Sequence, residues 1–164
     1  MPSDVAALEP APVAHAAMDD VYTKPGHLIR RLQQIAVASF MQECADQAIT
    51  PVQYAALVAV RDNPGLDATR IASLIAFDRS TLGSVLERLE AKGLIERRAK
   101  AEDRRIKILE ISNRGAKLLD DAEPAVLRAQ ERMLDPLNHE ERQDLLGLMR
   151  RIIERQDAQE GRTQ

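Results

Sequence analysis

The chain has 164 residues, of which 45% are hydrophobic and 30% are charged, and its net charge is −3 at pH 7. This length suffices for one hydrophobic core, and two Phe, two Tyr and no Trp predict an aliphatic core with few platforms for stacking single-stranded nucleic acid. One cysteine excludes an internal disulfide. Because the sequence shows neither an apolar run of about 18 residues nor a secretory signal, we expect a cytoplasmic protein.

The N-terminal segment changes character near Pro25. Residues 1–22 are rich in Ala and Pro and show no sustained period, so we expect a disordered tail. From Pro25 onward, mostly apolar residues recur at helical spacing and predict a first helix that ends near Cys44 or Asp46. The positions of that stripe are Leu28, Ile29, Leu32, Ile35, Ala36, Ser39 and Phe40.

Two shorter helices should follow. Thr50 before Pro51 is a typical helix start, and Asn63-Pro64-Gly65 is a break that ends this second helix. Asp67 is the expected N-cap of a third helix. Its inward-facing residues should be Ile71, Leu74 and Ile75.

A fourth helix, from about Arg79 to Lys92, is expected between the N-cap Asp78 and the left-handed Gly93. Its apolar face carries Leu82, Val85, Leu86 and Leu89 and should enter the core. The opposite face begins with small hydroxylated residues and almost no acid, so it can enter a major groove as the second helix of a helix-turn-helix. The residues expected to contact DNA are Arg79, Ser80, Thr81, Ser84 and Arg88.

A basic β-hairpin should follow this helix. Leu94 and Ile95 begin one extended segment, and Ile106, Ile108 and Ile111 form a second with charged residues interleaved. Residues 97–107 contain six basic and two acidic residues in a chain of net charge −3. Such a hairpin can place cations in a minor groove, although charge runs also occur simply as solvated faces.

Four cations of this hairpin are candidate DNA contacts: Arg97, Lys100, Arg104 and Arg105. Asp103 would be unfavourable beside phosphates, so we expect it to hold a neighbouring arginine by a charge-assisted hydrogen bond. An alternative is a winged protein-interaction module whose hairpin binds an acidic partner instead of DNA.

The C-terminal part predicts two more helices. Ser112 should cap a long helix, and Asp135-Pro136 separates it from a last helix that starts with a capping box between Asn138 and Glu141. The apolar residues of the last helix cover too wide an arc for one packing surface. We therefore expect the first and last helices to form a homodimer interface. The apolar residues are Leu145, Leu146, Leu148, Met149, Ile152 and Ile153.

The predicted fold class is mainly α with a small β-hairpin. Residues 49–112 would form a winged helix-turn-helix DNA-binding domain, and residues 23–48 and 113–158 would form the dimerisation helices. Partners would be double-stranded DNA and a second copy of the chain.

The hairpin motif resembles the MarR family of winged helix-turn-helix regulators. The family's wing signature corresponds to Asp103-Arg104-Arg105 followed by LEISNRG from Leu109 to Gly115, with Ile-Ser in place of Leu-Thr. Gly83 is a further departure, because the family often has a larger polar residue there. The resemblance, over residues 25–156, implies a dimeric, ligand-responsive transcription factor that is usually a repressor.

A small-molecule site is expected on the first helix. His27, Arg31 and Gln34 share one flank, and Tyr54 of the second helix could supply a wall, so that a carboxylate could meet Arg31. These residues could instead be simply solvated or ion-paired. The family resemblance favours a small aromatic acid, and PGHLIRRLQQI with ITPVQYAAL resembles regulators of nicotinic acid degradation, which would imply a hydroxylated nicotinate.

The sequence also bears on two other classes of function. A thiol-based oxidant sensor would use Cys44, but Glu43 and Asp46 should raise its pKa, which favours a structural cysteine. Catalysis is not expected, because His15, His27 and His139 show no metal-ligand spacing and no phosphate-binding loop occurs. No metal or other cofactor is expected.

Overall fold

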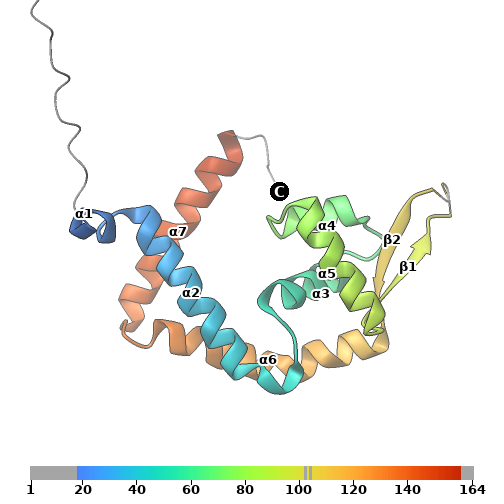
Figure 1. Cartoon of the computed structure of the whole chain (residues 1–164), viewed down its shortest axis with the longest axis horizontal. Coiled ribbons are helices and arrows are strands. Elements are labelled where there is room, and N and C mark those ends of the chain that lie inside the picture. Colours follow the sequence, from blue (N-terminus) through green and yellow to red (C-terminus); the bar gives the residue numbers. More distant parts are fainter. Residues whose placement is uncertain (1–17, 102, 104, 160–164) are drawn as a thin grey trace, which may run out of the picture. The chain divides into compact units, whose positions relative to one another are not determined.

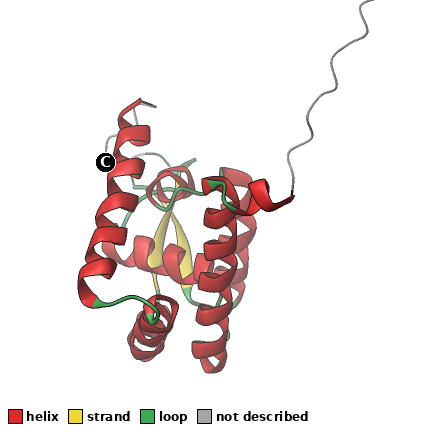
Figure 2. Cartoon of the chain, turned by 90° about the vertical axis from the view of Figure 1, so that its left-hand side faces the viewer, coloured by secondary structure: helices red, strands yellow, loops and turns green. Residues whose placement is uncertain are grey.

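The computed structural model describes residues 18–101, 103 and 105–159. Except for one antiparallel hairpin, its regular elements are helices (Figures 1 and 2), which confirms the predicted fold class. The described residues fall into two compact units that divide within α2, between Gln34 and Ile35. The elements are α1 Met18–Tyr22, α2 Pro25–Glu43, the 3-10 helix η1 Ala45–Gln47, α3 Pro51–Asp62, α4 Ala68–Leu74, α5 Arg79–Ala91, β1 Ile95–Ala99, β2 Lys107–Ile111, α6 Asn113–Leu134 and α7 His139–Gln159.

The first unit corrects part of the expected tail. Residues 18–22 form α1, so a disordered segment over 1–22 is wrong for these five positions, and residues 1–17 lie outside the described part. Local contacts explain the helix, because Lys24 forms a 2.8 Å ion pair with Asp20 and the Tyr22 ring packs edge-on against His27 at 5.1 Å. Such pairs supply stabilisation that the Ala- and Pro-rich composition does not indicate.

The predicted helix starts and stops are confirmed. Thr50 forms a reciprocal capping box with Gln53, and Asp67 accepts hydrogen bonds from two amides of the first turn of α4. Ser112 accepts from the amide of Gly115, and Gly93 has the left-handed backbone (φ 69°) that ends α5.

The core of the second unit lies around α3, α4, α5 and the hairpin. The four apolar residues predicted for α5 are all buried, and they pack with Leu57, Val60 and Ile71. Leu74 is an exception, since it is 40% exposed although an inward position was predicted. At 100° of rotation per residue, the buried face defined by Ile71 and Ala72 is centred near Ile75, and Leu74 lies on its flank.

The hairpin begins two residues after the left-handed Gly93. In Figure 1, α5 leads into β1, and β1 pairs antiparallel with β2 in a register that places Ile95 opposite Ile111 and Arg97 opposite Leu109. Ile95 and Leu109 are buried, whereas Glu96 and Arg98, which point to the other face of the hairpin, are exposed. The strand pair therefore has one side in the core and presents its charges to solvent.

Large apolar side chains remain exposed on the first and last long helices. None of the residues of α7 is buried. On α2, only Ser39 and Phe40 are buried. The large exposed apolar residues of these two helices are Leu28, Ile29, Leu32, Ile35, Val37, Met41, Leu148, Met149, Ile152 and Ile153.

Candidate nucleic-acid interface

The exposed face of α5 begins at a charged N-cap. Asp78 Oδ1 accepts hydrogen bonds from the Ser80 hydroxyl at 2.6 Å and from the Thr81 amide at 2.8 Å. These bonds, that of Ser80 first, hold the pKa of Asp78 well below its usual range. The cap is therefore an anion at neutral pH, and it fixes Ser80 at the start of the face.

Three further candidate residues lie on the same face. Thr81, Ser84 and Arg88 are exposed, and the Ser84 hydroxyl donates to the Thr81 carbonyl at 3.0 Å. Among the described residues the side chain of Arg88 has neither a hydrogen-bond nor an ion-pair partner, so its guanidinium is available to phosphate or guanine. Arg79 begins the helix, but its side chain lies outside the described part of the chain.

The hairpin is tied to this helix by an ion pair. Arg97 Nε lies 3.0 Å from Glu90 Oε2, so the predicted DNA contact Arg97 is already paired with a carboxylate of α5. Nothing in the sequence pattern indicated this pair, which the turn at Gly93 brings together. Its effect is to fix the base of the wing against the helix.

The remaining cations of the hairpin differ in what they contact. Lys100 and Arg105 are exposed, and Arg104 lies outside the described residues. Arg98, which was not among the candidates, forms ion pairs with Glu96 at 2.9 Å and Glu110 at 3.2 Å. The strand register places these two carboxylates opposite each other, so Arg98 is partly neutralised.

The carboxylate of Asp103 accepts a different donor from the one expected. Its Oδ1 accepts a 2.9 Å hydrogen bond from the backbone amide of Arg105, rather than from an arginine side chain among the described residues. A short acidic side chain two residues before an amide forms such a turn readily. Asp103 thus shapes the backbone at the tip of the hairpin.

The candidate effector residues are divided between the two units. Arg31 Nη1 donates to Gln34 Oε1 at 3.0 Å, and His27 lies against Tyr22, so these three residues are adjacent on α2. Tyr54 belongs to the second unit, where its ring packs against Phe40 at 5.8 Å and burial raises the pKa of its phenol. Three of the four residues, His27, Arg31 and Gln34, thus lie in the first unit, and Tyr54 lies in the second.

The environment of Cys44 opposes a sensor role. The residue is 1% exposed, and burial is the main cause that raises the pKa of its thiol, with Glu43 acting in the same direction and Arg128 opposing it. Reaction with oxidants requires an accessible thiolate, and both conditions are poorly met. The expected direction of the shift is confirmed, but desolvation is a larger cause than the neighbouring acid.

Two findings bear on other classes of site. In the part of the chain that the structure describes, no helix combines the length and the apolarity needed to cross a bilayer. Within the same residues, no group of three or more His, Cys, Asp or Glu side chains is placed to hold a metal ion.

Comparison with known proteins identifies relatives of this chain. The model of the MarR family matches residues 49–107, which include α3, α4, α5 and β1. The HTH-type transcriptional repressor NicR of Pseudomonas putida is 33% identical over 135 residues, which cover 82% of this chain and 85% of NicR.

Two solved structures are similar over most of their length. Bordetella bronchiseptica BpsR, whose DNA binding is regulated by 6-hydroxynicotinic acid, has a TM-score of 0.76 and 29% identity over 80% of this chain and 94% of BpsR. The repressor CouR, solved with a 23-mer DNA duplex, has a TM-score of 0.77 and 28% identity over 85% of this chain and 99% of CouR.

Proposed function

The chain belongs to the MarR family of transcriptional regulators, and from this premise we propose that it is a repressor that binds a pseudo-palindromic operator as a homodimer and is released by a small aromatic acid. It is a regulator and not an enzyme, as its relatives are. One observation carries the proposal most directly: the polar face of α5 is exposed, its opposite face is buried, and the Arg97–Glu90 pair joins it to a basic hairpin.

The two parts of the interface would have different roles. Ser80, Thr81, Ser84 and Arg88 would enter the major groove, where hydroxyl and guanidinium groups distinguish base edges. Lys100, together with Arg104 and Arg105, would lie along the minor groove and the phosphates, where positive charge contributes affinity with little sequence preference.

The exposed apolar faces of α2 and α7 support the proposed homodimer. An apolar surface of this extent on two helices is rarely left in water, and a second copy offers the same surface in return. A two-fold axis would place two copies of α5 about one turn of DNA apart, on the order of 34 Å, over an inverted repeat. A monomer in sedimentation at micromolar concentration would contradict this arrangement.

The DNA assignment is tested with duplexes selected from random sequence. We expect Ser84→Ala and Arg88→Ala to lower the preference for the selected duplex over a scrambled one by about tenfold each, because they remove contacts to base edges. Lys100→Ala and Arg104→Ala should weaken both duplexes alike and reduce the slope of log K against log salt by about 1 each. Arg61→Ala removes an exposed cation that is paired with Asp62 and serves as the control.

The outcome separates DNA reading from the protein-interaction alternative. If the wild type bound neither duplex at low salt, the hairpin would have to serve another partner. If Arg61→Ala lowered the salt slope as much as Lys100→Ala, the wing assignment would be wrong.

The proposed effector is a hydroxylated nicotinate. The relation to BpsR supports this class of ligand, and the Arg31–Gln34 pair offers a guanidinium for the carboxylate and an amide for a ring substituent. Calorimetric titration with 6-hydroxynicotinate should give saturable heat with the wild type and at least tenfold weaker binding with Arg31→Gln, while Arg30→Gln should bind as the wild type does. If the wild type gave no heat, 6-hydroxynicotinate would be excluded as the effector.

A further inference from the structure

One large apolar side chain is exposed on the basic hairpin. Ile106, the residue before β2, is 39% exposed and belongs to neither of the two clusters of buried apolar residues. Among the described residues of the hairpin, 95–101, 103 and 105–111, the other large apolar side chains are buried or half-buried. A single exposed isoleucine is ordinary on a protein surface, so its surroundings determine what it could contact.

The backbone fixes the position of Ile106 at the tip of the hairpin. The Ile106 amide donates to the Asp103 carbonyl at 3.0 Å, and the Ile106 carbonyl accepts from the Lys100 amide at 3.0 Å. Isoleucine is also stiff at its first side-chain torsion. A side chain that is already held in this way loses little conformational freedom when it meets a partner.

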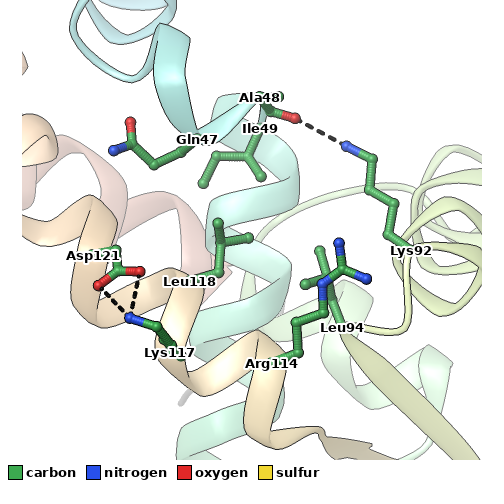
Figure 3. Close-up of a pocket in the computed structure, with 9 residues that line it drawn as sticks. All are labelled: Gln47, Ala48, Ile49, Lys92, Leu94, Arg114, Lys117, Leu118 and Asp121. Carbon is green, nitrogen blue, oxygen red and sulfur yellow. Dashed lines mark hydrogen bonds and ion pairs between the residues drawn. The ribbon is translucent and has the colours of Figure 1, made fainter.

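The base of the hairpin is held by the second unit. Leu94, the residue before β1, is 3% exposed and lines a cavity together with Ile49 and Leu118 (Figure 3). The Leu94 carbonyl also accepts from the Ser112 amide at 3.1 Å. The hairpin therefore projects its tip from an anchored base.

Positive charge surrounds Ile106. Its neighbours in the chain are Arg105 and Lys107, Lys100 lies across the hairpin, and all three are exposed. A protein partner that covered the isoleucine would also have to desolvate these cations, whereas nucleic acid neutralises them with phosphates. The minor groove of duplex DNA combines both kinds of contact, because its walls are deoxyribose rings and its edges carry the phosphates.

The floor of the minor groove differs between base pairs in one group that matters to an apolar side chain. All pairs present acceptors there, and a G·C pair adds the N2 amino group of guanine as a donor. Against a G·C pair, Ile106 would cover this amino group without offering it an acceptor. A covered donor without a partner weakens binding, so A·T pairs are favoured at this place.

We propose that Ile106 lies in the minor groove and makes the protein prefer A·T over G·C pairs beneath the hairpin. This inference rests on the proposed placement of the hairpin in the minor groove. It adds a sequence preference to a contact in which the cations alone contribute affinity with little preference. The preference arises because the guanine amino group is disfavoured, and no base is bound by a hydrogen bond from this side chain.

Inosine isolates the group in question, because an I·C pair has the major-groove pattern of a G·C pair and lacks the N2 amino group. In a duplex selected from random sequence, each base pair is replaced in turn by I·C and by G·C, symmetrically in both half-sites. The full-length wild type should bind the I·C duplex about tenfold more tightly than the G·C duplex at one or two positions of each half-site. Equal affinity at every position would overturn the proposal.

Variants assign this preference to the side chain. Ile106→Ala and Ile106→Ser should reduce the ratio of I·C to G·C affinity to about twofold or less, because the first uncovers the amino group and the second offers it an acceptor. Ile106→Val, which keeps a branched apolar side chain, should retain most of the ratio. None of these changes removes a charge, so the slope of log K against log salt should stay that of the wild type.

A second source of such a preference has to be separated. A·T-rich segments have a narrow minor groove that attracts cations, and the amino group of guanine also affects groove shape. If Ile106→Ala and Ile106→Ser kept the full ratio, the cations would be reading groove width and the proposal would be wrong. Leu74→Ala is the matched control, because Leu74 of α4 is a branched apolar side chain of nearly the same exposure, 40%, and its removal should leave the ratio unchanged.

Lys100→Ala distinguishes failure of this inference from failure of the proposed function. This variant should bind both duplexes more weakly, with a smaller salt slope, and should keep the wild-type ratio of I·C to G·C affinity. If Lys100→Ala left the salt slope unchanged, the placement of the hairpin on DNA would itself be wrong. If it reduced the slope while the wild type bound the I·C and G·C duplexes equally at every position, only the role of Ile106 would be wrong.

Discussion

Helices α5 and α7 have similar proportions of large apolar residues, but these residues are buried in α5 and exposed or half-buried in α7. In α5, Leu82, Val85, Leu86 and Leu89 are 0–6% exposed, whereas α7, the longer helix, has no buried residue and exposes Ile152 to 62%. The apolar face of α5 is covered by α3, α4 and the hairpin of the same chain. The apolar face of α7 is not buried in this way, and in the proposed homodimer a second copy of the chain would bury it.

The largest expected effect tests this difference directly. Leu86→Ala should lower the free energy of unfolding by about 4 kcal/mol, because the side chain is fully buried and a cavity would remain. Ile152→Ala should have an effect that depends on protein concentration, since it weakens association rather than the fold of one chain. Urea unfolding followed by circular dichroism at two protein concentrations about 100-fold apart measures both.

In that experiment, the loss caused by Leu86→Ala should be the same at both concentrations. A concentration-independent loss of several kcal/mol for Ile152→Ala would show that α7 is part of the core of a single chain, and the contrast between the two helices would disappear.

Two glycines, one near the start of α6 and one in α7, differ in how much space surrounds them. A Cβ on Gly115, near the start of α6, would collide with the backbone carbonyl oxygen of Leu94 and approach the Ile111 side chain, whereas a Cβ on Gly147 of α7 would meet nothing. Gly115→Ala should therefore cost about 3 kcal/mol, because backbone must move. Gly147→Ala should stabilise by about 0.5–1 kcal/mol through the lower entropy of the unfolded chain.

Thermal and urea unfolding of both variants provide the measurement. Gly115→Ala with wild-type stability would mean that the start of α6 does not lie against the segment after α5. The close approach also accounts physically for the glycine that ends the wing motif Leu109 to Gly115.

The two helices also start on different caps. Asp78 caps α5 with a carboxylate whose pKa is lowered, first by Ser80 and then by Thr81, whereas the Asn138 amide that accepts from Glu141 at the start of α7 does not titrate. Because the folded-state pKa lies below that of the unfolded chain, about 3.9, the contribution of Asp78 is complete above this value and is lost as the pH falls through the folded pKa.

Asp78→Asn keeps a good N-cap and removes this titration. Between about pH 4.5 and pH 2.5 the urea midpoint of the variant should therefore fall less steeply than that of the wild type. Asn138→Asp, which introduces a carboxylate at the start of α7, is the matched variant and should make the fall steeper. Parallel curves for wild type and Asp78→Asn would exclude the cap as a source of the pH dependence.

Local signals in the sequence predicted most of the elements of the fold. Caps and breaks such as Asp78, Gly93 and Ser112 act within a few residues, so their consequences can be derived without knowing the tertiary structure. Long-range pairs could not be derived: Lys92 meets Ala48 across 44 positions, and Arg97 meets Glu90 only because the chain turns at Gly93. The bond from the Arg105 backbone amide to Asp103 could not be derived either, because a carboxylate at this position can accept from a backbone amide or from an arginine side chain.

The smallest expected effect concerns the outer face of α5 itself. A Cβ on Gly83 would meet nothing, so Gly83→Ala should raise the free energy of unfolding by about 0.5–1 kcal/mol, as expected for alanine in a helix interior. Affinity for a selected duplex should stay within about twofold, because the added methyl group enters open space beside the exposed Ser84. Unfolding in urea and a binding titration measure the two quantities. If the variant were more stable but bound the duplex more than tenfold more weakly, the backbone at Gly83 would lie against the DNA, and the face of α5 that meets the groove would be centred on Gly83 rather than on Ser80 and Ser84.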